Sequence, residues 1–357
     1  MVKNTNLHKA KNAKNDEFYT QLTDVAKELM HYKKHFKDKI VFCNCDDPTW
    51  SAFWKYFHLN FAELGLKKLI SNHYDREEAT YKMEYTGGDD NDIEVGVKTP
   101  LEGNGDFRNQ ECLDLLDECD IVVTNPPFSC YRPYVATLME HKKKFIIWSN
   151  NNSITYKEIF PLLKNNEMWL GYTANKTLVF RIPDTYEKWD EKETQKMNDG
   201  NHYAKVPAIS VFTNLDIEKR HEKLILWKNY TPEEYPTYDN YDSINVNKVS
   251  DIPCDYNGVM GVPITFMDKY NPEQFEIVGL LQSSTDEQAG IPNLRYYNDF
   301  KEMRQDMSFT GASGGKANGN PVIKEKPVKG NFLYNPITKE YVHSLYARIV
   351  IRRKVGA

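Results

Sequence analysis

The stretch Asp120-Ile121-Val122-Val123-Thr124-Asn125-Pro126-Pro127-Phe128 predicts a buried strand that stops at a polar turn. The run 121–123 is apolar, as in buried strands, and the strand must end at the two prolines because neither can donate a sheet hydrogen bond. The turn presents the Asn125 amide, the Pro126 carbonyl and the Phe128 ring at the carboxyl end of a strand, the edge where α/β proteins place their sites. Two acceptors beside a flat ring suit a planar group that carries an amine. The alternative is an ordinary β-turn before a helix.

The segments before this turn predict an α/β fold with a parallel sheet. Residues 39–45 and 67–71 are typical of strands, and an aromatic helix at about 50–64, closed by Gly65 as its C-cap, lies between them. A β-α-β unit of this length is typical of right-handed parallel crossovers. Further strands are predicted at 144–148, 169–172, 178–182, 207–214 and 221–227, and further helices at 24–36, 134–143 and 154–163.

Two regions depart from this pattern. Residues 81–85 and 93–97 flank a Gly/Asp-rich turn and predict an inserted hairpin. Beyond about residue 228, Tyr, Asn, Asp and Pro become frequent. The chain is therefore expected to consist of a flexible basic arm at 1–15, a sheet-bearing domain at 16–228 and a mixed α/β region at 229–357. Within the last region we expect short strands at 264–267, 275–281 and 346–352 and a mobile Gly/Asn-rich loop at 311–320.

Composition limits the class of protein. A chain of 357 residues is expected to form one large domain and a smaller one. Its 40% hydrophobic and 27% charged residues are typical of globular proteins. No apolar run is long enough to span a membrane, and the first residues lack a secretory signal, so we expect a cytoplasmic protein. Six scattered cysteines without paired spacing predict reduced thiols and no metal site.

The distribution of charge is uneven. The formal net charge is −5, so any contact with a polyanion must use a local basic patch. Residues 301–357 contain eleven Lys or Arg and four Asp or Glu, an excess that could face phosphates. The alternative is that this excess lies on an ordinary solvated face.

Four short motifs occur in order along the chain: Phe18-Tyr19-Thr20, Asp46-Asp47-Pro48, Gly105-Asp106-Phe107 and Asn125-Pro126-Pro127-Phe128. Each is weak alone, but their order on a β-α-β frame is not expected by chance. They resemble the S-adenosylmethionine-dependent adenine-N6 DNA methyltransferases, whose catalytic motif is Asp/Asn-Pro-Pro-Tyr/Phe. More narrowly, residues 43–48 and 260–266 resemble the EcoRI-type adenine methyltransferase family, and the similarity extends over about residues 16–350.

The resemblance implies a Rossmann-like methyltransferase sheet in residues 16–228 and a target-recognition region that binds DNA in residues 229–357. It implies S-adenosylmethionine as the methyl donor, with no metal, and double-stranded DNA as the substrate. It also implies a restriction-modification system, in which a cognate endonuclease acts on the same site without a stable complex.

The resemblance also implies a role for each motif. Phe18, Tyr19 and Thr20 would pack around the methionine end of the cofactor. In the cofactor-binding segment Asp46-Asp47-Pro48, Asp46 would hold the cofactor amino group, with Asp47 as the alternative, and the N-terminus of the following helix would favour the cofactor carboxylate. The family's wider relatives have a glycine-rich loop at this point, which Asp-Asp-Pro-Thr-Trp replaces here.

The remaining motifs would hold the adenine rings and the ribose. Asp106 would accept a hydrogen bond from the adenine amine of the cofactor, and Phe107 would pack on that ring. The acid expected to bind the ribose hydroxyls is Asp75. The catalytic residues would be Asn125, Pro126, Pro127 and Phe128: Asn125 and Pro126 accept from N6 of the target adenine, while Phe128 stacks on the base after it is flipped out of the duplex.

Two other hypotheses remain open. The same Asn-Pro-Pro-Phe motif serves methyltransferases that act on RNA bases or on protein glutamine. An inactive nucleic-acid-binding protein with this fold is the third possibility, since a fold does not determine a function.

Overall fold

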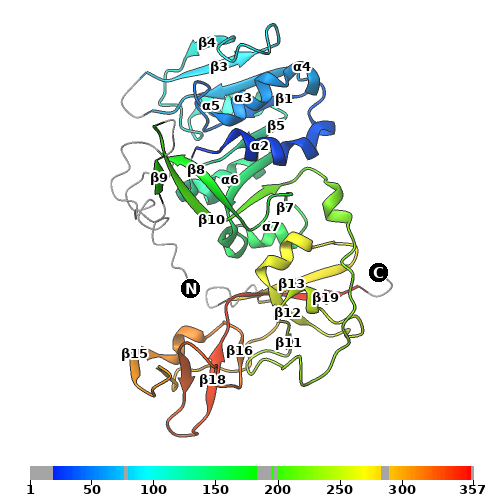
Figure 1. Cartoon of the computed structure of the whole chain (residues 1–357), viewed down its shortest axis with the longest axis vertical. Helices are drawn as coiled ribbons and strands as arrows, with labels where there is room; N and C mark the ends of the chain where they lie inside the picture. The colour runs from blue at the N-terminus through cyan, green and yellow to red at the C-terminus, as the bar shows by residue number, and fades with distance from the viewer. Residues whose placement is uncertain (1–18, 76–78, 183–193, 197–199, 283–288, 355–357) are drawn as a thin grey trace. The chain divides into compact units, whose positions relative to one another are not determined.

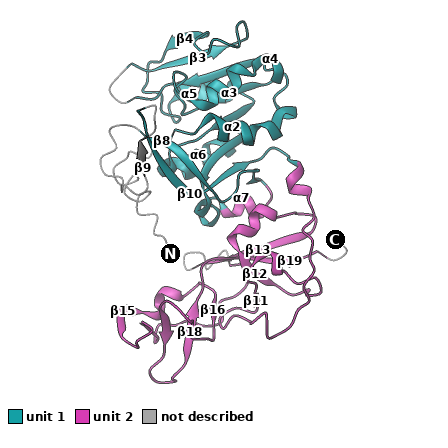
Figure 2. Ribbon diagram, in the orientation of Figure 1, with its two compact units in different colours: residues 1–159, 167–217 teal, residues 160–166, 218–357 magenta. Residues whose placement is uncertain are grey.

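The computed structural model describes residues 19–75, 79–182, 194–196, 200–282 and 289–354. The basic arm predicted at 1–15 therefore lies outside the described residues. The chain divides into two compact units: unit 1 comprises residues 1–159 and 167–217, and unit 2 comprises residues 160–166 and 218–357 (Figure 2). No helix in the described ranges is long and apolar enough to cross a membrane.

Unit 1 contains a mixed sheet, which Figure 1 shows with helices packed against it. Four neighbouring strands in the order β2-β1-β5-β6 are parallel, as the β-α-β pattern predicts, while β3, β4 and β10 run antiparallel to their neighbours. Along the sheet the order is β4-β3-β2-β1-β5-β6-β10-β7, and β8 and β9 also pair with β10. The strands are β1 Ile40–Cys43, β2 Lys68–Asn72, β3 Tyr81–Tyr85, β4 Val97–Pro100, β5 Ile121–Thr124, β6 Lys144–Asn150, β7 Trp169–Leu170, β8 Lys176–Ile182, β9 Thr194–Lys196 and β10 His202–Thr213.

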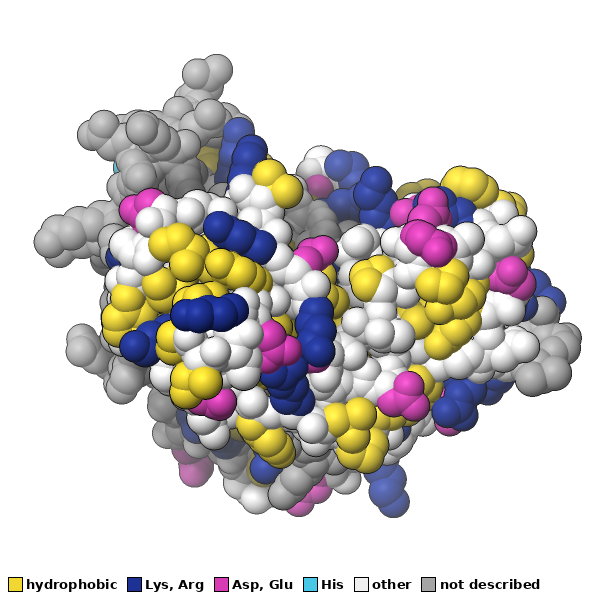
Figure 3. Space-filling model, turned by 90° about the horizontal axis from the view of Figure 1, so that it is seen from below, with side chains coloured by type: hydrophobic (Ala, Val, Ile, Leu, Met, Phe, Trp, Pro, Cys, Tyr) yellow, Lys and Arg dark blue, Asp and Glu magenta, His cyan; other side chains and the backbone are white. Residues whose placement is uncertain are grey.

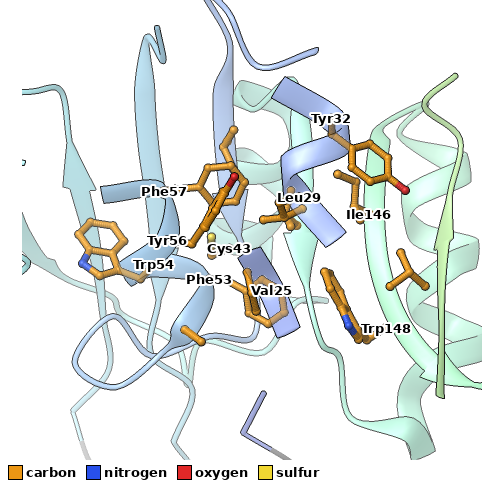
Figure 4. Packing of buried hydrophobic residues seen from close by; sticks show 14 of the residues in the cluster. Val25, Leu29, Tyr32, Cys43, Phe53, Trp54, Tyr56, Phe57, Ile146 and Trp148 are labelled. Carbon is orange, nitrogen blue, oxygen red and sulfur yellow. The ribbon is translucent and has the colours of Figure 1, made fainter. Parts of the chain in front are cut away.

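Two helices bury their apolar sides against this sheet. Val25 and Leu29 of α2 and Phe53 and Phe57 of α3 are buried in one cluster with Trp148 of β6 (Figure 4). The predicted C-cap is confirmed, because Gly65 adopts the left-handed conformation at the end of α4. The helical segments of unit 1 are α2 Leu22–Leu29, η1 Met30–His35, α3 Ala52–Leu59, α4 Phe61–Leu64, α5 Gln110–Glu118, η2 Phe128–Cys130, α6 Tyr131–Glu140 and η3 Asn151–Thr155.

Two elements of this part of the chain have bounds that differ from the predicted ones. The inserted hairpin is present as β3 and β4, but its second strand begins only at Val97. The helix predicted at 154–163 is wrong as a single element, because Tyr156 is extended after η3 and a separate helix, α7 (Phe160–Lys164), follows. Pro161 lies at the start of α7, where its missing N–H costs no helical hydrogen bond.

Unit 2 is built mainly from strands, in contrast to the mixed α/β region expected there. One sheet has the order β11-β12-β19-β13 and the other the order β15-β14-β17-β18-β16. The strands are β11 Ile244–Asn245, β12 Met260–Pro263, β13 Phe275–Leu281, β14 Lys301–Met303, β15 Phe309–Ser313, β16 Val322–Ile323, β17 Phe332–Tyr334, β18 Tyr341–Ser344 and β19 Arg348–Arg353. Short 3-10 turns join them: η4 Glu218–His221, η5 Val249–Asp251, η6 Ile264–Lys269 and η8 Gly314–Ala317.

Two predictions in this region are wrong. Residues 264–267 form η6 and not a strand, since the strand before them, β12, ends at Pro263. The loop predicted at 311–320 is structured as the end of β15 followed by η8. Asn318 holds it in place: its side-chain oxygen accepts from the Tyr297 N–H at 2.8 Å, and its amide donates to Asn298 at 2.8 Å.

The strand predicted at 221–227 is also absent. Ile225 and Trp227 are 85% and 66% exposed, so the apolar pattern there does not mark a buried strand. The backbone of Leu224 bonds instead to the Gln274 side chain, which accepts from its N–H at 2.8 Å and donates to its carbonyl at 2.8 Å. A side chain thus replaces a neighbouring strand.

We expect Gln274→Ala to lower the free energy of unfolding by about 1–3 kcal/mol, because both backbone groups of Leu224 lose their partner. Gln274→Glu is the matched comparison of equal length: it keeps the acceptor for the N–H but sets a second acceptor against the Leu224 carbonyl. Urea denaturation measures both variants, and each should be less stable than wild type. Equal stability of the three proteins would show that the Leu224 backbone finds other partners.

Candidate active site

The predicted site segments follow the carboxyl ends of three neighbouring parallel strands. Asp46 comes after β1, Asp75 after β2 and Asn125 after β5, and β1 pairs with both β2 and β5. Because the strands are parallel and adjacent, these segments meet at one edge of the sheet. The structure therefore brings together motifs that are up to about 80 residues apart in the sequence.

Asp46 is the buried centre of this edge. Its side chain is only 5% exposed; its carboxyl group accepts from Ser51 Oγ at 3.0 Å and from the backbone N–H of Asn125, and its other oxygen lies within hydrogen-bond distance of Thr124 Oγ1. Ser51 in turn caps α3 by accepting from the N–H groups of Phe53 and Trp54. One carboxyl group thus joins the end of β1, the start of α3 and the Asn-Pro-Pro turn.

Burial raises the pKa of Asp46 to about 7, although the hydrogen bonds from Thr124, Ser51 and Asn125 oppose the shift. The raised pKa means that the group binds its proton more tightly in the folded chain than in water. Nearby, Cys45 adopts a left-handed backbone conformation with φ 71°. A non-glycine residue in this conformation costs about 1–2 kcal/mol, so the chain makes here, without glycine, a turn that glycine would make with less strain.

Asp47 faces a different set of partners. Its carboxylate lies 2.7 Å from His73 Nδ1 and accepts from the Tyr81 hydroxyl at 3.0 Å and from the Thr49 hydroxyl at 2.7 Å. These contacts tie the loop after β1 to the end of β2 and to β3. Pro48, the third residue of the predicted segment, is buried beside them.

The Gly-Asp-Phe motif packs against the end of β2. The N–H of Asp75 donates to the Asn104 carbonyl at 3.2 Å, and the Asn72 amide donates to the Gly105 carbonyl at 2.8 Å. Gly105 has φ 73°, and a Cβ atom there would lie 2.3 Å from the His73 carbonyl oxygen. Only glycine fits this close approach.

Asp106 and Phe107 are fixed by neighbours. Arg108 donates to both oxygens of Asp106, at 2.8 and 2.6 Å, and this pairing holds the pKa of the Asp106 carboxyl below its usual value. Asp106 is therefore an ionised acceptor at neutral pH. Phe107 is buried and packs edge-on against Tyr134, with ring centroids 5.0 Å apart.

Tyr19 and Thr20 lie close to the loop after β1. Tyr19 forms an isolated bridge with Arg181, and its ring centroid is 4.0 Å from that of Trp50. Thr20 is buried, and its hydroxyl oxygen has no hydrogen-bond partner in the part of the chain that the structure describes. Phe18 lies outside the described residues.

The Asn-Pro-Pro-Phe turn is partly open to solvent. Pro126 is buried, whereas Asn125, Pro127 and Phe128 are partly exposed. Phe128 packs against the main core cluster and begins η2, in which the N–H of Cys130 donates to the Pro127 carbonyl at 2.9 Å. The turn thus leads directly into α6.

Sequence reasoning missed the residues that hold the motifs. Ser51 and Thr124 bind the Asp46 carboxyl, and Arg108 binds Asp106. A serine directly before an aromatic helix is a signal for its N-cap, but nothing in the sequence indicates that the same hydroxyl also reaches Asp46.

Among the described residues, no group of three or more His, Cys, Asp or Glu side chains is arranged to hold a metal ion. All six cysteines, each within those ranges, are free thiols.

The mixed α/β sheet and the Asn-Pro-Pro-Phe turn after β5 are those of an α/β methyltransferase. The family model for the adenine-specific methyltransferase EcoRI matches residues 6–354, and the chain belongs to this family. It is an adenine-specific DNA methyltransferase.

Curated relatives agree with this assignment. The type II methyltransferase M.EcoRI of Escherichia coli is 48% identical over 76% of this chain and 88% of its own length. The type II methyltransferases M.MgeORF184P of Mycoplasma genitalium and M.MpnI of Mycoplasma pneumoniae are each 40% identical over 77% of this chain, covering 86% and 85% of their own lengths. No solved structure matches the chain significantly.

Replacing Gly105 by alanine tests how tightly the Gly-Asp-Phe motif is packed. The new methyl group would clash with the His73 carbonyl oxygen. Gly330→Ala is the matched control, because φ is also positive there (87°) and no atom of the described residues outside the adjoining chain lies within 4 Å of the added Cβ. We expect Gly330→Ala to cost about 1 kcal/mol of unfolding free energy, and Gly105→Ala at least about 2 kcal/mol more. Thermal denaturation measures both, and equal losses would contradict the close packing.

Proposed function

We propose that this enzyme transfers a methyl group from S-adenosylmethionine to N6 of an adenine that has been flipped out of duplex DNA. The observation that carries the proposal is the Asn-Pro-Pro-Phe turn, held at the carboxyl edge of the sheet beside the loop after β1 and the Gly-Asp-Phe motif. When bound, S-adenosylmethionine supplies an activated sulfonium methyl group.

The residues around the proposed cofactor site fit that molecule. Thr20 places a buried hydroxyl there whose oxygen has no partner within the described ranges, and ionised Asp106 can accept a hydrogen bond from an adenine amine. Asp75 lies at the end of β2, where dinucleotide-binding folds place the acid that binds ribose hydroxyls. Asp47, Tyr19 and Phe18 would complete the methionine end.

The Asn125 amide oxygen and the Pro126 carbonyl accept the two N6–H bonds of the target adenine. These acceptors localise the nitrogen lone pair and stabilise the positive charge that develops on N6 as the N–C bond forms and the C–S bond breaks. N6 then loses one proton to solvent. Pro127 fixes the turn, and Phe128 stacks on the flipped base, which offsets part of the few kcal/mol lost on unstacking.

The five-stranded sheet of unit 2 offers a surface for the DNA. Cross-strand partners lie on the same face of a sheet, and the pairs Lys301↔Tyr334, Met303↔Phe332, Met303↔Phe309 and Tyr334↔Tyr341 define one such face. We call it the aromatic face; its residues are Lys301, Met303, Phe309, Phe332, Tyr334 and Tyr341. Leu333 and Val342, on the opposite side, are buried in a core cluster.

Lysines lie over the rings of the aromatic face. Lys326 Nζ is 5.8 Å from the Tyr341 ring centroid and 4.7 Å from that of Phe332, a ring that is itself buried, and Lys301 Nζ is 5.7 Å from the Phe309 centroid. Phe309 and Tyr341 are 49% and 38% exposed. Figure 3 shows Lys and Arg side chains among hydrophobic ones toward the left, where Figure 1 labels β15 and β18. Cations beside exposed rings on a segment with excess positive charge suit duplex DNA, because lysines neutralise phosphates and rings contact sugars and base edges.

The type II relatives also suggest a biological role for the methylation. We infer that the enzyme modifies one short DNA sequence and protects it from a cognate restriction endonuclease. The test of this function is the transfer of a labelled methyl group to duplex DNA, with RNA and protein as the alternative acceptors. Uptake by RNA or protein in place of DNA would overturn it.

Asn125→Ala tests the catalytic motif. The variant loses one of the two proposed acceptors of N6, so we expect kcat to fall by a factor of roughly 100 or more, by analogy with the loss of one transition-state hydrogen bond. Binding of S-adenosylmethionine, measured by calorimetry, should change little, since Asn125 is assigned to the adenine. Substantial activity in the variant would count against the assignment.

Lys301→Ala and Lys326→Ala test the aromatic face. Each variant is expected to weaken binding to duplex DNA and to reduce the slope of log affinity against log salt by about 0.9, the value for one phosphate contact. Lys67→Ala is the control, because this exposed lysine precedes β2 at the opposite, amino edge of the unit 1 sheet. If neither Lys301→Ala nor Lys326→Ala changes the slope of log affinity against log salt, the DNA binds elsewhere. The same conclusion follows if Lys67→Ala changes that slope equally.

A further inference from the structure

We propose that Asp46 is a positioning residue, whose buried carboxyl group fixes Thr124 and the backbone of Asn125 so that the Asn-Pro-Pro turn meets the target adenine in one orientation. This inference rests on the proposed function and assigns to Asp46 a role other than binding the cofactor amino group.

The contacts of the carboxyl group carry the inference. One oxygen accepts from Ser51 and the other is hydrogen-bonded to Thr124, while the Asn125 N–H also points at the group. The side chain is 95% buried, the complement of its 5% exposure. Both oxygens therefore already have protein partners, and those partners belong to the capped helix and to the catalytic turn.

The number of hydrogens available to Thr124 indicates the protonation state of the Asp46 carboxyl group. Thr124 has one hydroxyl hydrogen, yet its oxygen lies within hydrogen-bond distance of two acceptors, the Asn44 carbonyl and an oxygen of Asp46. If Asp46 carries a proton on that oxygen, it donates to Thr124, and Thr124 donates to Asn44, so that every group is satisfied. The raised pKa of Asp46 agrees with this arrangement.

A neutral carboxylic acid and a carboxamide are similar in shape and in this pattern of bonds. In Asp46→Asn, the amide N–H can donate to Thr124 while the amide oxygen accepts from Ser51. A carboxylate that binds the cofactor's ammonium group would behave differently, because the amide has lost the negative charge. The Asn variant therefore separates a positioning role from cofactor binding.

The experiment compares Asp46→Asn with Asp46→Ala in kcat for methylation of duplex DNA and in the dissociation constant for S-adenosylmethionine. We expect Asp46→Asn to retain a kcat within about threefold of wild type. Asp46→Ala should lower kcat by roughly 100-fold, the effect of a small misplacement of a reacting group, with the cofactor affinity nearly unchanged. A tenfold or greater loss of cofactor affinity in both variants would overturn the inference in favour of the ammonium contact.

A second pair covers the possibility that Asp46→Ala does not fold. Thr124→Val removes the hydroxyl at nearly constant volume and should lower kcat, whereas Thr124→Ser keeps the hydroxyl and should restore it. Equal kcat in the two variants would overturn the inference. If the wild-type protein methylates no DNA, the proposed function fails; if it is active and Asp46→Ala is equally active, only the positioning role fails.

Discussion

One buried carboxyl group is shared by three segments at the carboxyl edge of the unit 1 sheet. Asp46 lies where β1 ends, and its partners are the residue that caps α3 and the two residues at which β5 turns into the Asn-Pro-Pro segment. Parallel strands bring these chain segments to one edge but leave their exact separation open. A buried group whose partners lie on both sides favours one separation, because leaving any of those polar groups unpaired in the interior is costly.

The same edge shows two ways of making a tight turn. At Gly105 the close approach to the His73 carbonyl excludes any side chain, so the sequence uses glycine. At Cys45 the backbone has a similar positive φ, but the residue carries a side chain, so its conformation is strained. The Asp46 contacts that follow immediately can offset this strain. The absence of a glycine-rich loop after β1 is thus consistent with a turn held by side-chain hydrogen bonds.

Local patterns allowed much of unit 1 to be predicted from the sequence. The apolar runs of β1, β2, β5 and β6 and the C-cap at Gly65 were predicted because each depends on neighbouring residues. Adenine specificity was also predicted from the four motifs, and the family from residues 43–48 and 260–266; both are confirmed. The bonds that hold the motifs were not predicted: the Ser51, Thr124 and Arg108 contacts depend on side-chain geometry.

Unit 2 shows the limit of such patterns. The apolar residues at 221–227 suggested a strand, but the Gln274 side chain takes the place of a strand neighbour, and Trp227 is exposed. Residues 264–267 form a 3-10 turn because the preceding strand ends at Pro263. Where side chains supply the hydrogen-bond partners of the backbone, the pattern of apolar residues no longer predicts the secondary structure.

Two of the carboxyl groups at this edge, those of Asp46 and Asp106, illustrate how the environment gives similar residues different properties. Burial raises the pKa of Asp46, while the guanidinium of Arg108 lowers that of Asp106. A carboxyl group that keeps its proton can both donate and accept, so it can join protein groups in the interior without a buried charge. A carboxylate that has lost its proton only accepts, which suits the amine of an adenine. The pKa values of Asp46 and Asp106 are thus shifted in opposite directions at one sheet edge. Asp46 is suited to join protein groups there, and Asp106 is suited to bind a ligand.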